Sequence, residues 1–294
     1  MSLHDAIAHA ISAASGEVFR PESCKGVGGG CINTAEVLEG GARRYFVKFN
    51  DAVRLEMFEA ELEGLREIAG SKSVRVPQPV CFGVQGDKAY LVLEYLDIGR
   101  SHGKSDELLG RQLAGMHRAT GPRFGWLRRN TIGSTPQINT PEENWVTFYR
   151  EHRLRFQFEL AATNGYGTDL LQNAERLLEI LPAFFTGYHP LPSLLHGDLW
   201  GGNHATLNDG TPVIFDPAVY YGDREADLAM TELFGGYGPG FYSSYREVWP
   251  LDPGYPIRRD LYNLYHVLNH LNLFGGGYRE QAVQIINQLL SEAG

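Results

Sequence analysis

The sequence predicts an α+β fold in two lobes, a small lobe over residues 1–96 built on an antiparallel sheet and a mainly helical lobe over residues 97–294. Three observations support this prediction. The chain has 294 residues, of which 43% are hydrophobic, enough to bury a core of that size. Before Leu96, short apolar runs are separated by glycines, which is typical of strands and turns. After Asp97, apolar residues recur at the spacing of long helices.

The small lobe is expected to begin with a helix and to continue as a sheet. Apolar residues recur at helical spacing from Leu3 to Ile11, Ser2 is a favourable N-cap, and Gly16 is a stop signal. We expect five strands and one internal helix before Leu96. Four of the strands are expected at residues 33–38, 43–49, 80–84 and 89–95, and the helix, charged with an apolar stripe, at residues 53–69.

The second lobe is predicted to contain long helices with one exception. The helices are expected at residues 107–118, 141–161, 168–180, 256–274 and 280–290. In residues 194–215, short apolar runs alternate instead with glycine, asparagine and aspartate. Because loops held by a rigid scaffold often carry catalytic residues, this stretch is the first place to look for chemistry.

Composition and charge exclude several classes of protein. The chain has 26 basic and 35 acidic residues, so its formal net charge is −9, which gives no global attraction for nucleic acid or an anionic membrane. Three cysteines are too few for a disulfide framework and fit a reducing compartment. Neither a secretory signal nor an apolar run of about 18 residues is present. We therefore predict a cytoplasmic protein that acts on a small molecule, without nucleic-acid or membrane partners.

The loop-rich stretch holds three polar residues at set intervals. His196–Gly197–Asp198 is followed by Asn203, five residues after the aspartate, and by Asp216, thirteen residues further on. Phosphoryl transfer from ATP needs a carboxylate near the acceptor hydroxyl and oxygen ligands for Mg²⁺, and kinases place an Asp, an Asn and a second Asp in this order. The spacing predicts Asp198 as the catalytic base and Asn203 and Asp216 as magnesium ligands.

A kinase also needs residues upstream that bind the nucleotide, and the small lobe supplies candidates in the required order. The glycine-rich segment Gly28, Gly29, Gly30 and Cys31 would let backbone N–H groups approach the phosphates. Lys48, twenty residues after Gly28, would contact the α and β phosphates, and Glu61 on the next helix would hold its ammonium group. Glu94, Tyr95 and Leu96, at the end of the last strand, would offer main-chain groups to adenine.

With these residues in place, the sequence resembles the fructosamine kinase family, or ketosamine-3-kinases, which share the fold of aminoglycoside phosphotransferases and protein kinases. The similarity spans nearly the whole chain. It rests on the segments 28–33 (GGGCIN), 57–61 (MFEAE), 195–203 (LHGDLWGGN), 215–218 (FDPA), 221–229 (YGDREADLA) and 265–272 (YHVLNHLN). Trp200 after Leu199 and Pro217 after Asp216 narrow the resemblance to this family within the wider phosphotransferase group.

The resemblance implies a reaction and a set of ligands. ATP would phosphorylate the 3-hydroxyl of a ketoamine, a fructosamine or ribulosamine adduct on a free amine or a glycated lysine, and the resulting ester could decompose and free the amine, so that glycated protein is repaired. Mg²⁺ would bind with ATP and assist the transfer of the phosphoryl group.

Two further residues have alternative interpretations. Trp200 is a candidate wall of the acceptor site or, alternatively, a core residue. Oxidation of Cys31 could distort the glycine-rich segment and switch activity off, or Cys31 could be a small residue in a turn.

Alternatives remain open from the sequence. The acceptor could be an aminoglycoside or a choline-like alcohol, since kinases of those compounds share the Asp198 and Asn203 pattern. A metallophosphoesterase would need upstream carboxylate and histidine ligands, and no convincing pair is found. A non-catalytic nucleotide-binding protein of this fold would be expected to have lost one of the key residues. Glu61 is one of several glutamates on its helix, and Asp223 and Asp227 are interpreted as structural.

Overall fold

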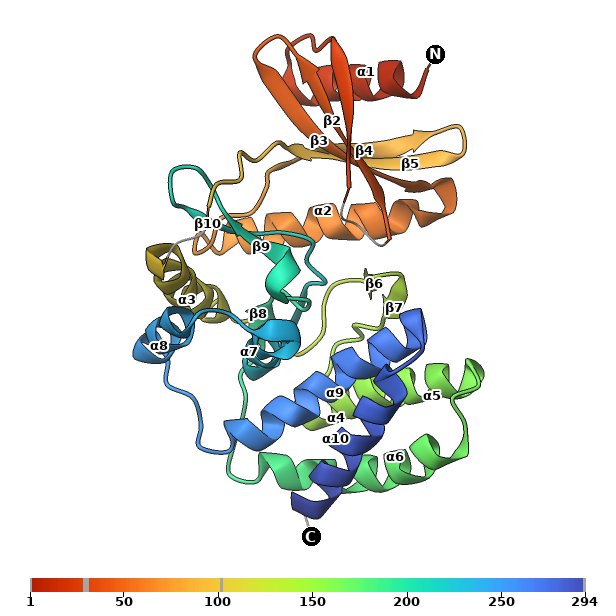
Figure 1. Cartoon of the computed structure of the whole chain (residues 1–294), viewed down its shortest axis with the longest axis vertical. Helices are drawn as coiled ribbons and strands as arrows, with labels where there is room; N and C mark the ends of the chain where they lie inside the picture. Colours follow the sequence, from red (N-terminus) through yellow and green to blue (C-terminus); the bar gives the residue numbers. More distant parts are fainter. Residues whose placement is uncertain (1, 29–31, 101–102, 293–294) are drawn as a thin grey trace.

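The computed structural model describes residues 2–28, 32–100 and 103–292, and its N-terminal part is a five-stranded antiparallel sheet with a helix on each face (Figure 1). The strands β1 (Ser23–Val27), β2 (Thr34–Gly40), β3 (Arg43–Asp51), β4 (Pro79–Gln85) and β5 (Lys88–Glu94) lie in the order β1-β2-β3-β5-β4. Helix α1 (Leu3–Ser15) covers one face and helix α2 (Leu55–Gly70) covers the other. The predicted five-stranded sheet is confirmed.

The two helices bury different apolar stripes. Ile7 and Ile11 of α1 pack on Leu38 and Val47 in a core formed by α1, Phe19 and the sheet. The buried residues of α2 belong instead to a second core that extends through the C-terminal part of the chain. Because α2 shares that core, it joins the sheet to the C-terminal helices. This packing sets which side chains of α2 can contact β3.

The remainder of the chain is mainly helical, as predicted, and this confirms the fold class. Its helices are α3 (Gly103–His117), α4 (Trp145–Tyr149), α5 (Phe156–Thr163), α6 (Thr168–Ile180), α7 (Glu225–Glu232), α8 (Pro239–Val248), α9 (Tyr255–Phe274) and α10 (Tyr278–Glu292). None of the helices in the described part of the chain is long and apolar enough to cross a membrane. Helix α10 packs along α9, next to the C-terminus (Figure 1).

The helix predicted over residues 141–161 is present, but it starts four residues later and is not regular throughout. The side chain of Asn144 accepts a hydrogen bond from the Thr147 N–H and starts α4 there, and residues 150–155 then form a π-helical turn before α5. Within that turn, Arg153 is fully buried, and its Nη2 donates to Asn139 Oδ1 at 2.7 Å. The wider turn brings this charged side chain inward, which a regular helix with a solvated charged face would not do.

Three short two-stranded ladders lie between the helices, and one of them attaches the loop-rich stretch, residues 194–215, to the segments next to the sheet. They pair β6 (Asn130–Ile132) with β7 (Thr135–Gln137), β8 (Ser193–Leu195) with β11 (Tyr220–Gly222), and β9 (His204–Thr206) with β10 (Pro212–Ile214). Backbone bridges join Val213 to Arg75 and Leu207 to Ile98, so the β9–β10 hairpin is attached to the segments that flank β4 and β5. The residues that follow β8 and β10 therefore lie beneath the sheet.

Candidate active site

The loop after β8 contains a position, Gly197, that only glycine can occupy. Gly197 has φ +82°, and a Cβ there would lie 2.1 Å from the carbonyl oxygen of Ala218, too close for any side chain. Two consecutive N–H groups of this turn bind one buried carboxylate. Asp227 Oδ2 accepts from the His196 N–H at 2.7 Å, and Oδ1 accepts from the Gly197 N–H at 2.8 Å. Helix α7 thereby holds the loop immediately before Asp198.

His196 supports this loop through both ring nitrogens. Its Nε2 lies 2.9 Å from the carbonyl oxygen of Phe215, and its Nδ1 accepts a hydrogen bond from the Asp198 N–H at 3.3 Å. These partners place the proton on Nε2 of a neutral ring. Burial lowers the pKa of His196, which keeps the ring neutral. The imidazole thus ties the segment before Asp216 to the backbone of Asp198.

Asp198 and Asn203 form a pair within one loop. Asn203 Nδ2 donates to the carbonyl oxygen of Asp198 at 2.8 Å and lies 3.4 Å from its carboxylate Oδ2. Burial, helped by the negative charges of Asp216 and Asp227, raises the pKa of Asp198 to about 7. A carboxylate with a raised pKa accepts a proton more readily than an ordinary aspartate. Because the amide nitrogen of Asn203 faces Asp198, its Oδ1 is the atom available to a cation.

Lys48 of β3 joins the sheet to both α2 and the segment after β10. Its buried Nζ lies 2.6 Å from Glu61 Oε1 and 2.6 Å from Asp216 Oδ1. Burial opposes the charge of the ammonium group, but the carboxylates of Asp216 and Glu61 outweigh it and raise the pKa of Lys48 above its usual value. The lysine is therefore charged, and it is paired with one carboxylate from α2 and one from the segment after β10.

Asp216 adopts the left-handed backbone conformation, with φ +59°. Aspartate tolerates this region better than most residues because its short side chain can bond locally. The side chain is 46% exposed, so its carboxylate can reach a ligand as well as Lys48. Together Asp216 and Asn203 Oδ1 offer the hard oxygen donors that Mg²⁺ prefers.

The remaining predicted nucleotide-binding residues lie on two segments. Gly28 follows β1, whereas Gly29, Gly30 and Cys31 lie outside the described residues. At the end of β5, the Glu94 N–H donates to the carbonyl oxygen of Gln78 at 2.9 Å, so this main-chain group is already bonded within the fold.

Side chains hold the end of β5 in place. The carboxylate of Glu94 accepts from Arg75 Nη2 at 2.6 Å. The Arg44 guanidinium lies 4.2 Å from the centre of the Tyr95 ring and pairs with Asp97 at 2.7 Å. Leu96 follows in this segment and is half-buried.

Trp200 is a surface residue and not part of the core. Its side chain is 41% exposed, and its ring covers Gly202, where a Cβ would lie 2.3 Å from the indole. The carbonyl oxygen of Trp200 accepts from the Tyr237 hydroxyl at 3.2 Å, and Tyr237 stacks on His204 with ring centres 4.2 Å apart. An aromatic surface thus lies two residues beyond Asp198.

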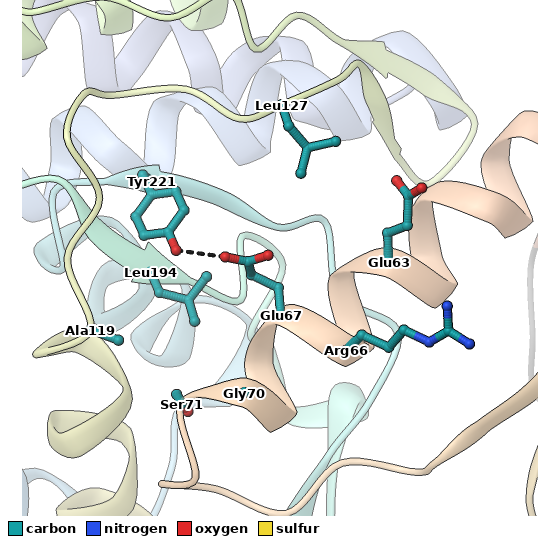
Figure 2. Close-up of a pocket in the computed structure, with 9 residues that line it drawn as sticks. All are labelled: Glu63, Arg66, Glu67, Gly70, Ser71, Ala119, Leu127, Leu194 and Tyr221. Atoms are coloured by element: carbon teal, nitrogen blue, oxygen red, sulfur yellow. Dashed lines mark hydrogen bonds between the residues drawn. The ribbon is translucent and has the colours of Figure 1, made fainter.

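A pocket of about 570 Å³ lies elsewhere, behind the C-terminal half of α2 (Figure 2). None of the predicted site residues lines it. In Figure 2, the Tyr221 hydroxyl points at Glu67, to which it donates at 2.6 Å. Two further glutamates of α2, Glu59 and Glu63, pair with Arg128 at 2.8 and 3.1 Å. These contacts attach α2 to the C-terminal part of the chain.

Asp227 has the structural role that the sequence indicated, but the sequence did not show which groups it binds. Its carboxylate accepts hydrogen bonds from two loop N–H groups and lies 3.1 Å from Nε2 of His117. Burial opposes its ionisation, but His117 and the loop donors lower the pKa of Asp227. The signal was the aspartate at a fixed distance after Asp216, within a segment that resembles the family's.

Comparison with known proteins identifies close relatives in sequence. The profile of the family described as fructosamine kinase matches residues 3–292. A protein named probable ketoamine kinase from Synechocystis sp. is 47% identical over 286 residues, which cover 97% of this chain and 96% of that protein. A chloroplastic protein-ribulosamine 3-kinase from Oryza sativa subsp. indica is 44% identical over 278 residues, covering 94% and 81% of the two chains.

Solved structures show the same fold. The crystal structure of a protein named as a fructosamine-3-kinase from Haemophilus somnus superimposes with a TM-score of 0.90 at 26% identity, covering 98% of this chain and all of that one. A second such structure, from Thermobifida fusca, gives a TM-score of 0.84 at 31% identity over 98% and 99% of the chains. Aminoglycoside phosphotransferase APH(4)-Ia gives 0.61 at 14% identity over 100% and 99%, which reflects the fold alone.

Proposed function

Because the chain belongs to the fructosamine kinase family, we propose that it is an ATP-dependent kinase of ketoamines that phosphorylates the 3-hydroxyl of the sugar adduct. The single observation that supports the chemistry most directly is the position of Lys48, which contacts Glu61 of α2 and Asp216 of the loop at 2.6 Å each. The acceptors are fructosamine or ribulosamine adducts, on free amines or on protein lysines, and the reaction serves to remove them.

In the proposed mechanism, the side chains of the site divide the work of transfer. The Lys48 ammonium, kept charged and oriented by Glu61, binds phosphate oxygens of ATP. Gly28 and the glycines after it approach the phosphates with backbone N–H groups. The segment of Glu94, Tyr95 and Leu96 borders the adenine.

Asp198 accepts the proton of the acceptor hydroxyl, and its raised pKa of about 7 suits that role. Its orientation comes from Asn203 and, through the loop backbone, from Asp227. Asn203 Oδ1 and the Asp216 carboxylate would hold Mg²⁺, which when bound neutralises charge on the phosphates. The exposed indole of Trp200 packs against the sugar or its amine-bearing arm.

The proposal includes a cytoplasmic location. ATP is the phosphoryl donor, and the described cysteines, Cys24 and Cys81, are free thiols, which is the state that a reducing compartment maintains.

The test is acceptor-dependent release of ADP from Mg·ATP. The panel contains a fructosyl-lysine, a ribulosyl-lysine, an aminoglycoside and choline, each with the wild type, with Asp198→Asn and with Asp87→Asn, an exposed aspartate outside the site, as the matched control. We expect turnover only with the ketoamines and a loss of at least ~10²–10⁴-fold in Asp198→Asn. Turnover with choline or the aminoglycoside alone would overturn the acceptor assignment, and a normal rate in Asp198→Asn would remove that residue from the base role.

A further inference from the structure

Three side chains of metal-binding type meet on the far side of the sheet, away from the catalytic loop. They are His4 of α1, Cys24 of β1 and Glu36 of β2. His4 Nε2 lies 2.8 Å from Glu36 Oε2, Cys24 Sγ lies 3.0 Å from the same oxygen, and Cys24 Sγ lies 3.7 Å from His4 Nε2. The nitrogen, sulfur and oxygen atoms therefore form a compact triangle.

Secondary structure brings these residues together. His4 lies on the same stripe of α1 as Ile7 and Ile11, which pack on the sheet. Cys24 is opposite Leu38 in the β1–β2 ladder, and Leu38 is buried beneath α1, so Cys24 is on the face that α1 covers. Glu36 is two residues before Leu38 and shares this face.

The cluster lies beside the apolar contact between α1 and the sheet. Its three members come from three successive elements, α1, β1 and β2. The site is thus defined by the fold and not by one flexible segment.

We propose that His4, Cys24 and Glu36 bind a zinc ion, through the imidazole Nε2, the thiolate and the carboxylate, with water as the fourth ligand. These are the nitrogen, sulfur and oxygen donors that zinc uses in proteins. With the usual zinc–ligand distances, tetrahedral geometry places the ligand atoms about 3.4–3.6 Å apart. From the present separations of 2.8, 3.0 and 3.7 Å, zinc binding moves the Glu36 oxygen about 0.6 Å further from the other two atoms and leaves the nitrogen–sulfur distance nearly unchanged.

Charge and access favour a divalent cation. A thiolate and a carboxylate together carry two negative charges, which a zinc ion neutralises, and the histidine binds as a neutral ring. Without metal, the Cys24 thiol donates its hydrogen to Glu36, so a cation takes the place of that proton. The side chains of His4 and Glu36 are 42% and 32% exposed, and Cys24 is exposed, so the ion and its water can enter from solvent.

The position of the site gives zinc a structural consequence. β1 is an edge strand whose residues are all exposed, and it leads directly to Gly28 and the glycine-rich segment. A metal ion bound by both Cys24 and His4 would attach the edge strand β1 to α1. Zinc is expected to stabilise the sheet by binding the folded state.

The experiment uses the full chain, freed of metal by a chelator and kept reduced, in excess Mg²⁺ so that other oxygen sites are filled. Cobalt(II) serves as a spectroscopic probe and zinc is titrated by calorimetry. We expect one equivalent of each metal, a thiolate-to-cobalt charge-transfer band, displacement of cobalt by zinc, and release of the thiol proton. The melting temperature should rise with zinc.

Matched variants identify the ligands. Cys24→Ser should lose the charge-transfer band, and His4→Gln and Glu36→Gln should weaken zinc binding by at least tenfold. Cys81→Ser and His9→Gln change a cysteine of β4 and an exposed histidine of α1 outside the cluster and should bind as the wild type does.

Some results would overturn the proposal. They are a charge-transfer band that survives in Cys24→Ser, zinc affinity that is unchanged in His4→Gln and Glu36→Gln, or no bound metal in the wild type. If Cys24→Ser does not fold, the band in the wild type and the affinities of the other two variants decide. None of these readouts uses phosphoryl transfer, so they stand apart from the proposed function.

Discussion

Replacing Asp227 by asparagine tests whether α7 positions the catalytic loop. The carboxylate accepts from the His196 and Gly197 N–H groups at 2.7 and 2.8 Å and lies 3.1 Å from His117 Nε2. Asparagine has the same shape but only one oxygen, and its NH₂ group cannot accept a hydrogen bond. At least one loop N–H would therefore face another donor inside the protein, because Asp227 is 1% exposed.

The magnitude follows from these bonds. A hydrogen bond to a charged group contributes about 1.5–3 kcal/mol, and a buried donor without a partner costs about 1–3 kcal/mol. One such bond is lost and the other loses its charge, so we expect the free energy of unfolding to fall by about 2–4 kcal/mol. Because Gly197 directly precedes Asp198, a displaced loop also moves the base, for which a loss of about 10²-fold in kcat is reasonable.

The assays are urea unfolding and steady-state kinetics with a ketoamine acceptor. Asp223→Asn is the matched control, because Asp223 is equally buried nearby but its carboxylate accepts from the hydroxyls of Tyr188 and Tyr262 at 2.9 and 2.6 Å and from the Glu225 N–H at 3.0 Å, and not from the N–H groups that Asp227 binds. Both variants should lose stability, and only Asp227→Asn should lose kcat per folded molecule, with the KM for ATP nearly unchanged. Equal kcat losses in the two variants, or none in Asp227→Asn, would refute the reasoning.

Two further predictions concern the metal ligands and the pH dependence of stability. Asp216→Asn keeps a residue that tolerates φ +59° but removes a carboxylate, so ATP affinity should gain less from added Mg²⁺ than in the wild type; an unchanged response to Mg²⁺ in nucleotide titrations would contradict the assignment. Burial lowers the pKa of His266 from 6.5 to about 3, so the unfolded state binds a proton that the folded state excludes, and stability is lost as pH falls from about 6.5 towards 3. Between pH 6.5 and 5, His266 alone lowers the free energy of unfolding by about 2 kcal/mol. In denaturant unfolding, the free energy of unfolding of His266→Phe should change with pH with a slope that is smaller by about one proton than in the wild type. An unchanged slope would contradict the prediction.

The architecture was predictable because its signals are local. Strand alternation, glycine turns and helical periodicity each extend over a few residues, and they indicated the sheet and most of the long helices. Helices α7 and α8 were both missed. In α7, residues 225–231 are all buried, polar ones included, so the sequence lacks the one-sided apolar pattern of a surface helix. The π-helical turn at residues 150–155 was missed because a run of charges normally indicates a solvated face. Here Arg153 is buried against aromatic rings, 4.1 Å from the centre of Tyr220.

The candidate site was only partly readable for a different reason. The spacing of Asp198, Asn203 and Asp216 is a property of one loop and one hairpin, so the sequence carries it. The hydrogen bonds of Asp227 to a loop 30 residues earlier depend on how α7 packs, so the local sequence indicated a structural role for Asp227 but not its partners. The same applies to the His4, Cys24 and Glu36 cluster, whose members are spread over three elements.

Glu61 shows how the fold resolves an ambiguity that the sequence leaves. Its helix also carries Glu59, Glu63 and Glu67, and nothing in their spacing alone says which of them meets Lys48. In the folded chain, Glu59 and Glu63 pair with Arg128 and Glu67 accepts from Tyr221, all toward the C-terminal part of the protein. Only Glu61 of these four faces Lys48 at 2.6 Å. The neighbouring glutamates therefore set the rotation of α2, and with it the position of the ion pair that orients Lys48.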